Sequence, residues 1–196
     1  MPPDDRGGPA GPFGVLFVCT GNICRSPTAE ALARRELARH PGVPIQVSSA
    51  GSHALEGNPA ASRSILAAAE RGAGLERHFA RELTRRRVRA ADLVLCMAAE
   101  HRPFVLSYDR SAADRTFLLA SFARVADEWG WQAAPPAGLV ALAAEHATEQ
   151  PGDDVDDPLG QPPEAYAACA ERLDGLVTPV IAALVKAMPA GDPGPT

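Results

Sequence analysis

A cysteine and an arginine with five residues between them frame a short loop near the start of the chain. The stretch reads Val18-Cys19-Thr20-Gly21-Asn22-Ile23-Cys24-Arg25-Ser26-Pro27. A thiolate is a strong nucleophile, and a guanidinium offers a planar fork that matches two phosphate oxygens. Glycine and asparagine adopt positive φ most easily, which a loop needs when its N–H groups turn inward around an anion. We interpret residues 19–25, the cradle loop, as a phosphate site with its own nucleophile.

The spacing alone is not specific, because it occurs again between Cys96 and Arg102. That second copy contains no glycine and is typical of a helix start. In the first copy, Ser26 suits a helix N-cap and Pro27 suits the first helical position. A helix N-terminus that points at a loop favours an anion. We therefore predict that the first copy forms the cradle and that the second is a coincidence.

Cys19 is the candidate nucleophile, and its attack on phosphorus would form a phosphocysteine intermediate. Arg25 and the loop N–H groups would hold the equatorial oxygens, which is the main part of phosphoryl-transfer catalysis. We assign Asn22 to the shape of the loop. The predicted substrate-binding residues are Thr20, Gly21, Asn22, Ile23, Cys24 and Ser26.

The leaving oxygen needs a proton, and an aspartate-rich loop late in the chain can supply one. Four aspartates crowd this loop just before Pro158, namely Asp153, Asp154, Asp156 and Asp157. Like charges close together raise carboxyl pKa values, which suits a general acid. Composition alone leaves open which of the four acts.

The surrounding pattern alternates strands with helices. Apolar runs predict strands at residues 13–18, 45–50, 92–97 and 116–119. Helical patterns occupy residues 27–40, 60–71, 98–108, 121–129 and 163–188, with Ser121 as a cap, and residues 85–89 form a basic, solvated helix face. This order predicts an α/β fold with an open parallel sheet. Ligands bind beyond the carboxyl ends of such strands, which is where the cradle loop lies.

The composition bounds the remaining possibilities. The chain has 196 residues, a formal net charge of −5 and four cysteines, so we expect no nucleic-acid partner. The cysteines show no zinc-ligand spacing, and we expect no metal and no cofactor. The sequence contains no run of about 18 apolar residues, so we predict no membrane span. Residues 1–12 lack the apolar core of a signal peptide. We expect a cytoplasmic, bacterial protein.

The predicted organisation is one domain at residues 13–188. Residues 1–12 are expected to be a disordered leader and residues 189–196 a disordered tail. Residues 130–150 are rich in alanine and proline and are predicted to be a loop-plus-helix insertion.

The opening motif, followed much later by Asp157-Pro158, resembles the low-molecular-weight protein tyrosine phosphatases. Further stretches agree with that family: Ser49-Ala50-Gly51, Gly57-x-Pro59, His78-x-Ala80-Arg81-x-Leu83 and Ala91-Asp92-Leu93-Val94-Leu95-x-Met97. The resemblance implies a three-layer α/β/α fold with a four-stranded parallel sheet. It also implies a phosphorylated protein (phosphotyrosine) or a small phosphomonoester as the partner.

The resemblance also assigns roles. By it Cys19 is the nucleophile, Arg25 the phosphate clamp, Ser26 the hydrogen-bond donor to the thiolate and Asp157 the general acid. It further implies a reversible disulfide between Cys24 and Cys19 that protects the nucleophile from over-oxidation.

The chain departs from the family where the cleft walls are expected. Leu159-Gly160 follow Asp157-Pro158, where many members carry aromatic residues. The loop after Gly51 reads Ser52-His53-Ala54-Leu55, without the aromatic often found there. His53, Trp129 or Trp131 could substitute, although packing elsewhere is the simpler expectation for each. Ile23 resembles the tyrosine-phosphatase branch, since the phosphoarginine branch tends to threonine there.

Two alternatives stay open. An arsenate reductase on the same fold would use the cradle for arsenate, but it needs two further cysteines about seven residues apart. Cys96 has no such partner, and Cys169 lies on an apolar helix face. A non-catalytic phosphate-binding protein would not need Cys19, Arg25 and the Asp-Pro pair together.

Overall fold

The computed structural model describes residues 11–130 and 135–188. Its sheet has four parallel strands in the order β2-β1-β3-β4. The strands are β1 (Phe13–Cys19), β2 (Ile45–Gly51), β3 (Leu93–Cys96) and β4 (Thr116–Leu118). The helices are α1 (Arg25–Leu37), α2 (Ser62–Ala69), α3 (Arg85–Ala90), α4 (His101–Tyr108), the 3₁₀ helix η1 (Arg110–Arg115), α5 (Leu119–Trp129), α6 (Pro136–His146) and α7 (Pro163–Ala187).

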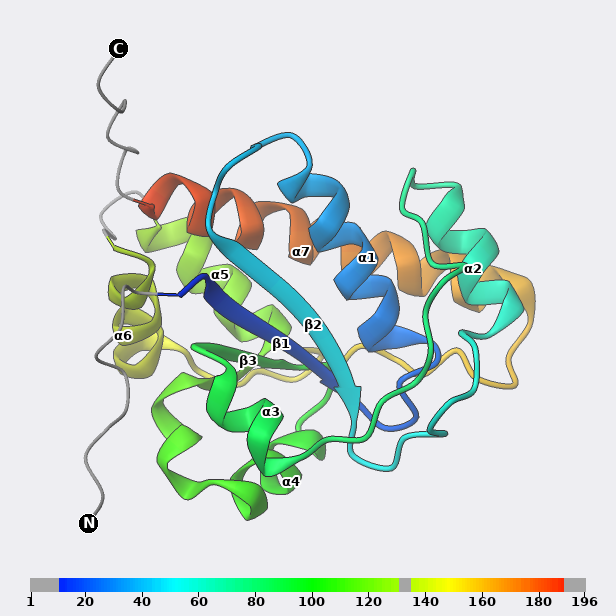
Figure 1. The fold of residues 1–196 in the computed structure, drawn as a ribbon, viewed down its shortest axis with the longest axis horizontal. Coiled ribbons are helices and arrows are strands. Elements are labelled where there is room, and N and C mark those ends of the chain that lie inside the picture. Colours follow the sequence, from blue (N-terminus) through cyan, green and yellow to red (C-terminus); the bar gives the residue numbers. More distant parts are fainter. Residues whose placement is uncertain (1–10, 131–134, 189–196) are drawn as a thin grey trace.

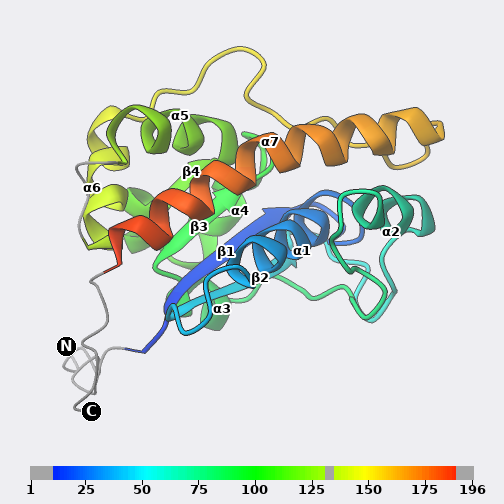
Figure 2. The ribbon, with the colours of Figure 1, turned by 90° about the horizontal axis from the view of Figure 1, so that it is seen from above.

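The sheet is covered on both faces, which confirms the predicted three-layer fold (Figures 1 and 2). One core cluster lies between the sheet and helices α1, α5 and α7, and it includes Phe17, Leu32, Phe122 and Leu173. A second cluster lies on the opposite face, beneath α3, α4 and η1. Burial on both faces explains why the strands read as continuous apolar runs.

Strand β1 lies between β2 and β3, so the chain changes direction across the sheet at this strand. After β1 the chain crosses through α1 to β2, and later it returns to place β3 on the other side of β1. In open α/β sheets such a switch point leaves room for a ligand beyond the strand ends. The cradle loop follows β1 at this position.

Two local predictions are wrong at helix starts. Helix α1 begins at Arg25 with Cys24 as its N-cap, so Ser26 lies in the first turn and does not cap the helix. Helix α5 begins at Leu119, and the Ser121 hydroxyl donates back to the Leu118 carbonyl. In the first case the cradle loop leads directly into the helix, which therefore starts two residues before the predicted start at residue 27.

Other predicted segments agree with the structure. Residues 85–89 lie in α3, where Val88 is buried and the arginine side chains face outward to different degrees. Helix α7 covers most of the predicted helix at residues 163–188 and continues through Gly175 and Pro179. Helix α6 lies inside the expected insertion at 130–150, of which residues 131–134 are outside the described part of the chain.

The expectations for the two ends concern residues that the structure mostly does not describe. Of the leader, only Gly11 and Pro12 lie within the described residues, and the tail lies outside them. Within residues 11–130 and 135–188, no helix is long and apolar enough to cross a membrane. In the same ranges no three or more His, Cys, Asp or Glu side chains are grouped to hold a metal ion.

Gly51, the last residue of β2, cannot carry a side chain without moving the cradle loop. A Cβ atom there would lie 2.4 Å from the Thr20 carbonyl oxygen and 3.0 Å from the Ala54 Cα atom. We predict that Gly51→Ala lowers the free energy of unfolding by roughly 1–3 kcal/mol, the usual cost of overpacking. Denaturant unfolding measures this change.

Gly175→Ala is the matched control, because the space around Gly175 in α7 is open within 4 Å. Alanine is favoured over glycine inside a helix by about 1 kcal/mol, so this variant should be more stable than the wild type. Equal stability of the Gly51→Ala variant and the wild type would contradict the close approach of β2 to the cradle loop.

Candidate active site

The cradle loop is held from outside by its carbonyl groups. The carbonyl oxygens of five consecutive residues, 19–23, all accept hydrogen bonds from neighbouring loops at 2.8–3.1 Å. The donors are the backbone N–H groups of Ser52, His53, Leu55 and Ala61 and the ring Nε2 of His78. Residues 52–61 follow β2, so the loop after one strand fixes the loop after its neighbour.

Outward carbonyls force the amide N–H groups inward. In a trans peptide the C=O of one residue and the N–H of the next point in opposite directions. The five N–H groups of residues 20–24 therefore face the hollow of the loop. The Asn22 N–H shows this directly, because it donates to Cys19 Sγ at 3.3 Å. A ring of inward N–H groups around a thiol is an anion site.

Asn22 holds the strained turn of the loop. Its φ is +54°, and the positive φ falls on this residue and not on Gly21. The buried side chain accepts a hydrogen bond from the Arg81 N–H at 2.8 Å through Oδ1. Its Nδ2 donates to the hydroxyls of Ser26 and Ser49, both at 2.9 Å. The side chain thus ties the αL turn to Arg81, Ser26 and Ser49.

The hydrogen bonds orient the Ser26 hydroxyl toward the thiol. Asn22 Nδ2 can only donate, so Ser26 Oγ is the acceptor in that contact. The Ser26 hydroxyl hydrogen is then free to donate. Its nearest acceptor is Cys19 Sγ at 2.9 Å, and the Ala50 carbonyl lies farther away at 3.4 Å.

A buried carboxylate ends this polar chain. Glu30 in α1 is 1 % exposed and accepts from Ser49 Oγ at 2.5 Å and from Arg81 at 2.7 Å. Because the Ser49 hydroxyl donates to Glu30, its oxygen is left to accept from Asn22. The arrangement runs from Glu30 through Ser49 and Asn22 to Ser26 and the thiol.

Arg25 is buried and has three protein acceptors. Its NH1 donates to the Val155 carbonyl at 3.2 Å, and its NH2 donates to Thr20 Oγ1 at 3.1 Å and to Asp157 Oδ2 at 2.5 Å. The guanidinium has five N–H hydrogens, so two remain for a ligand beside these three contacts. Asp157 thereby lies at the cradle, although it is 132 residues away in the sequence.

The other aspartates of the acidic loop have separate partners. Asp153 is paired with Arg124 at 2.5 and 2.8 Å, and the hydrogen bonds from Arg124 lower the pKa of Asp153. The expectation that crowding raises carboxyl pKa values is therefore wrong for Asp153. Asp154 accepts the Ala99 N–H at 2.8 Å. Among the contacts of the Arg25 guanidinium described above, the one with Asp157 is the contact that involves an aspartate side chain of this loop.

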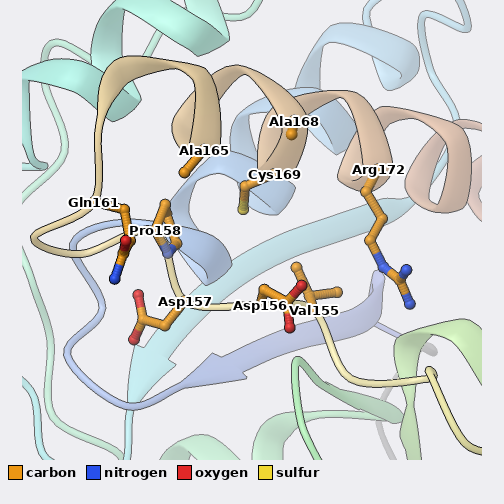
Figure 3. Close-up of a pocket in the computed structure, with 9 residues that line it drawn as sticks. All are labelled: Val155, Asp156, Asp157, Pro158, Gln161, Ala165, Ala168, Cys169 and Arg172. Carbon is orange, nitrogen blue, oxygen red and sulfur yellow. The ribbon is translucent and has the colours of Figure 1, made fainter.

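A cavity of about 550 Å³ lies between the acidic loop and α7. It is lined by Val155, Asp156, Asp157, Pro158, Gln161, Ala165, Ala168, Cys169 and Arg172. Figure 3 shows the Asp157 carboxylate pointing away from α7, while Cys169 points from α7 toward the loop. The cavity therefore lies on the α7 side of the acidic loop, and the Asp157 carboxylate points away from that side.

Apolar and aromatic side chains lie on segments that neighbour the cradle loop and the acidic loop. Leu55 and Leu159 are about half exposed, and their N–H groups bond to the Gly21 carbonyl and to Asp157 Oδ1. His53 meets Phe104 of α4 edge-on, with ring centroids 4.8 Å apart. These four side chains form the rim of the site. Trp129 stacks on His146 instead, and Trp131 lies outside the described residues.

The second Cys-x5-Arg stretch is not an anion loop. Cys96 is fully buried, and burial raises the pKa of its thiol to about 12. Arg102 donates to the Thr116 carbonyl on the far strand. The prediction of a coincidence is confirmed for the cysteine and the arginine, although His101 within this stretch does reach the cradle loop at Thr20.

Sequence reasoning gave no role to several residues that shape the site. They are Glu30, Ser49, His78, Arg81 and His101. Ser49, His78 and Arg81 lie in stretches that resemble the family, which was the available signal. Glu30 carries a weaker signal, since it is a carboxylate among alanines on the apolar side of α1.

Comparisons with known proteins agree with this geometry. A family model, "Low molecular weight phosphotyrosine protein phosphatase", matches residues 14–139. The low molecular weight protein-tyrosine-phosphatase Etp of Escherichia coli K12 is 42 % identical over 108 residues, which cover 55 % of this chain and 70 % of Etp. The protein-arginine-phosphatase of Geobacillus stearothermophilus is 31 % identical over 166 residues, which cover 85 % of this chain and 92 % of that protein.

Solved structures extend the likeness over the fold. The low molecular weight protein tyrosine phosphatase of T. tengcongensis superposes with a TM-score of 0.69 and 33 % identity, covering 87 % of this chain and 98 % of that one. The Erwinia amylovora tyrosine phosphatase AmsI gives a TM-score of 0.66 and 28 % identity, covering 89 % and 94 %. The chain belongs to the low molecular weight protein-tyrosine-phosphatase family and is a cysteine-dependent phosphatase, a hydrolase.

The polar chain behind the thiol makes a prediction about Ser49. Replacing Ser49 by alanine removes one of the two acceptors of Asn22 Nδ2 and a donor to Glu30. We expect a loss of about 1–3 kcal/mol in the free energy of unfolding, because buried polar groups lose their partners. Phosphatase turnover should also fall, since Asn22 loses an anchor.

Ser48→Ala is the control for this experiment. Ser48 is the neighbour on β2, and its hydroxyl makes only a long 3.5 Å contact with the Val15 carbonyl. Chemical denaturation and aryl phosphate kinetics on both variants measure the difference. Equal effects of the two substitutions would show that Ser49 does not support the loop.

Proposed function

We propose that the protein hydrolyses aryl phosphomonoesters, with phosphotyrosine on a protein as the preferred substrate, through a phosphocysteine intermediate at Cys19. The observation that carries this proposal is the convergence of Cys19 Sγ, Arg25 and Asp157 around one ring of inward N–H groups. The thiol, the clamp and a carboxylate are all within one site. A small phosphomonoester is the alternative substrate of the same chemistry.

In the first step the Cys19 thiolate attacks phosphorus, and the bond from phosphorus to the leaving oxygen breaks. Arg25 and the loop N–H groups hold the three equatorial oxygens, where negative charge is concentrated. Asp157 gives its proton to the leaving oxygen, so an alcohol or phenol departs. The products are phosphocysteine, an Asp157 carboxylate and the dephosphorylated alcohol.

In the second step water attacks the phosphocysteine from the side that the leaving group vacated. Asp157 now accepts a proton from this water, which is the reverse of its first role. The sulfur–phosphorus bond breaks, inorganic phosphate leaves and the Cys19 thiolate is restored. The Ser26 hydroxyl, 2.9 Å from Sγ, stabilises the thiolate as nucleophile and as leaving group.

The rim supports an aryl substrate over phosphoarginine. Both tyrosine and arginine phosphatases are among the relatives. In this chain Leu55, Leu159 and the His53–Phe104 pair present apolar and aromatic surface beside the cradle. Such surface suits an aromatic ring. Ile23, which packs into a buried cluster with Ala67 and Ala80, matches the tyrosine-phosphatase branch.

Arsenate reduction is not favoured by the other cysteines. A disulfide relay needs thiolates, yet burial raises the pKa values of Cys96 and Cys169 to about 12. All four cysteines are free thiols in the structure. The protective Cys19–Cys24 disulfide and a cytoplasmic location are further parts of the proposal.

We predict that the wild-type protein hydrolyses p-nitrophenyl phosphate and a phosphotyrosine peptide. Cys19→Ser should abolish this activity, because serine is a much poorer nucleophile at neutral pH. Inorganic phosphate should still bind, since Arg25 and the N–H groups remain. Steady-state kinetics and calorimetric phosphate titration measure the two properties. Equal activity of the variant and the wild type would rule out the phosphocysteine route.

The assignment of the acid gives a second prediction. Asp157→Ala should slow alkyl phosphate hydrolysis about 10²- to 10⁴-fold, the usual contribution of a general acid. Aryl phosphates with acidic phenols should lose much less, because such leaving groups depart unprotonated. Asp156→Ala is the matched control in the same loop. If Asp156→Ala and not Asp157→Ala shows this dependence on the leaving group, the assignment is wrong.

A further inference from the structure

The hydroxyl of Thr20, the first residue after Cys19, lies between two side-chain nitrogens. His101 Nε2 is 3.0 Å from Thr20 Oγ1, and Arg25 NH2 is 3.1 Å from the same oxygen. His101 is 1 % exposed and begins α4, the helix that follows β3, the strand next to β1. The contact therefore joins the loops that follow β1 and β3.

The second contact of His101 decides which of its two ring nitrogens carries the hydrogen of the neutral imidazole. The Ala98 N–H donates to His101 Nδ1 at 3.0 Å, and a backbone N–H cannot accept. Nδ1 is therefore the unprotonated nitrogen of a neutral ring, and Nε2 carries the hydrogen. Nε2 must then donate to Thr20 Oγ1. Burial lowers the pKa of His101 to about 4, with Arg25 as the next cause, so the ring is neutral at pH 7.

Both lone pairs of the Thr20 hydroxyl are then used. A hydroxyl oxygen accepts two hydrogen bonds and donates one. Here His101 and Arg25 are both donors, and an arginine N–H never accepts. The Thr20 hydroxyl can act only as a donor. It needs an acceptor other than these two nitrogens, and the side chain is partly exposed toward the site.

The position of this donor is informative. Arg25 NH2 contacts Thr20 Oγ1 and Asp157 Oδ2 at once. The Thr20 oxygen and the Asp157 carboxylate therefore share one guanidinium nitrogen. A phosphoryl group that takes the place of Asp157 on this nitrogen brings its oxygens close to the Thr20 hydroxyl. An anion there supplies the acceptor that the hydroxyl requires.

We propose that the Thr20 hydroxyl donates an additional hydrogen bond to the phosphoryl group, and that His101 is a positioning residue that keeps this hydroxyl a donor. The inference rests on the proposed function and adds a side-chain donor to the backbone N–H groups of the loop. It also gives a role to one residue of the second Cys-x5-Arg stretch.

Thr20→Val tests the donor, because valine keeps the shape and removes the hydroxyl. A hydrogen bond to a charged group is lost, so kcat/KM for p-nitrophenyl phosphate should fall about 10- to 100-fold. The inhibition constant of inorganic phosphate should rise as well. Thr20→Ser restores a hydroxyl and should lose much less than Thr20→Val. Equal losses in the two variants, or none in Thr20→Val, would overturn the proposal.

Two substitutions of His101 separate positioning from structure. His101→Gln can still donate to Thr20 from its amide nitrogen, whereas His101→Asn can only replace the acceptor for the Ala98 N–H. We expect His101→Asn to lower kcat/KM like Thr20→Val, and His101→Gln to lower it less. The double variant Thr20→Val/His101→Asn should lose no more than Thr20→Val, because the two changes remove one interaction.

Melting temperatures and a distant control complete the experiment. If kcat/KM of the Thr20 and His101 variants follows their melting temperatures, and not whether a hydrogen-bond donor is kept at these positions, His101 is only structural and the proposal fails. His40→Asn, in the turn after α1 at the other end of the helix from the cradle, should leave kcat/KM unchanged. A wild-type protein without hydrolysis would refute the proposed function itself. An active wild type with an equally active Thr20→Val variant would refute this inference alone.

Discussion

The outward orientation of five carbonyl groups is the constraint on which the site depends. Each peptide of the cradle loop presents its carbonyl to a neighbouring loop, so each N–H turns toward the hollow beside Cys19. The loop does not stabilise this arrangement by itself. The segment after β2 supplies four of the five donors and His78 the fifth. The anion site is thus built by two adjacent loops at one end of the sheet.

Buried polar groups connect this site to the helix layer. Glu30, Arg81, Ser49 and Asn22 form one hydrogen-bonded chain that ends at Ser26. Buried polar atoms cost free energy unless they are paired, and the donors and acceptors of Glu30, Ser49, Asn22 and Ser26 match in direction. The same matching orients the Ser26 hydroxyl toward the thiol, so the network both stabilises the fold and prepares the nucleophile.

Arg25 connects the cradle to the last third of the chain. Its contacts with Val155 and Asp157 hold the acidic loop over the cradle. Thr20 Oγ1, which also contacts His101, accepts from the same guanidinium. The clamp is paired with the carboxylate of Asp157. In the proposed reaction a phosphoryl group takes the place of the Asp157 carboxylate on the guanidinium, which leaves Asp157 to act as the acid.

The amino-acid sequence alone predicts the strand–loop–helix unit around Cys19, the parallel sheet and the segment that contains the carboxylate. These follow from local patterns: apolar runs, the Gly-Asn turn and the alternation of strands with helices. It could not select Asp157 from the residues alone, nor reveal Glu30, His78 and His101, because their partners are distant in the chain. The helix start at Arg25 was missed for the same reason, since the loop's outside contacts set it. Only the tertiary structure decides these features, because hydrogen-bond direction depends on which groups meet in space.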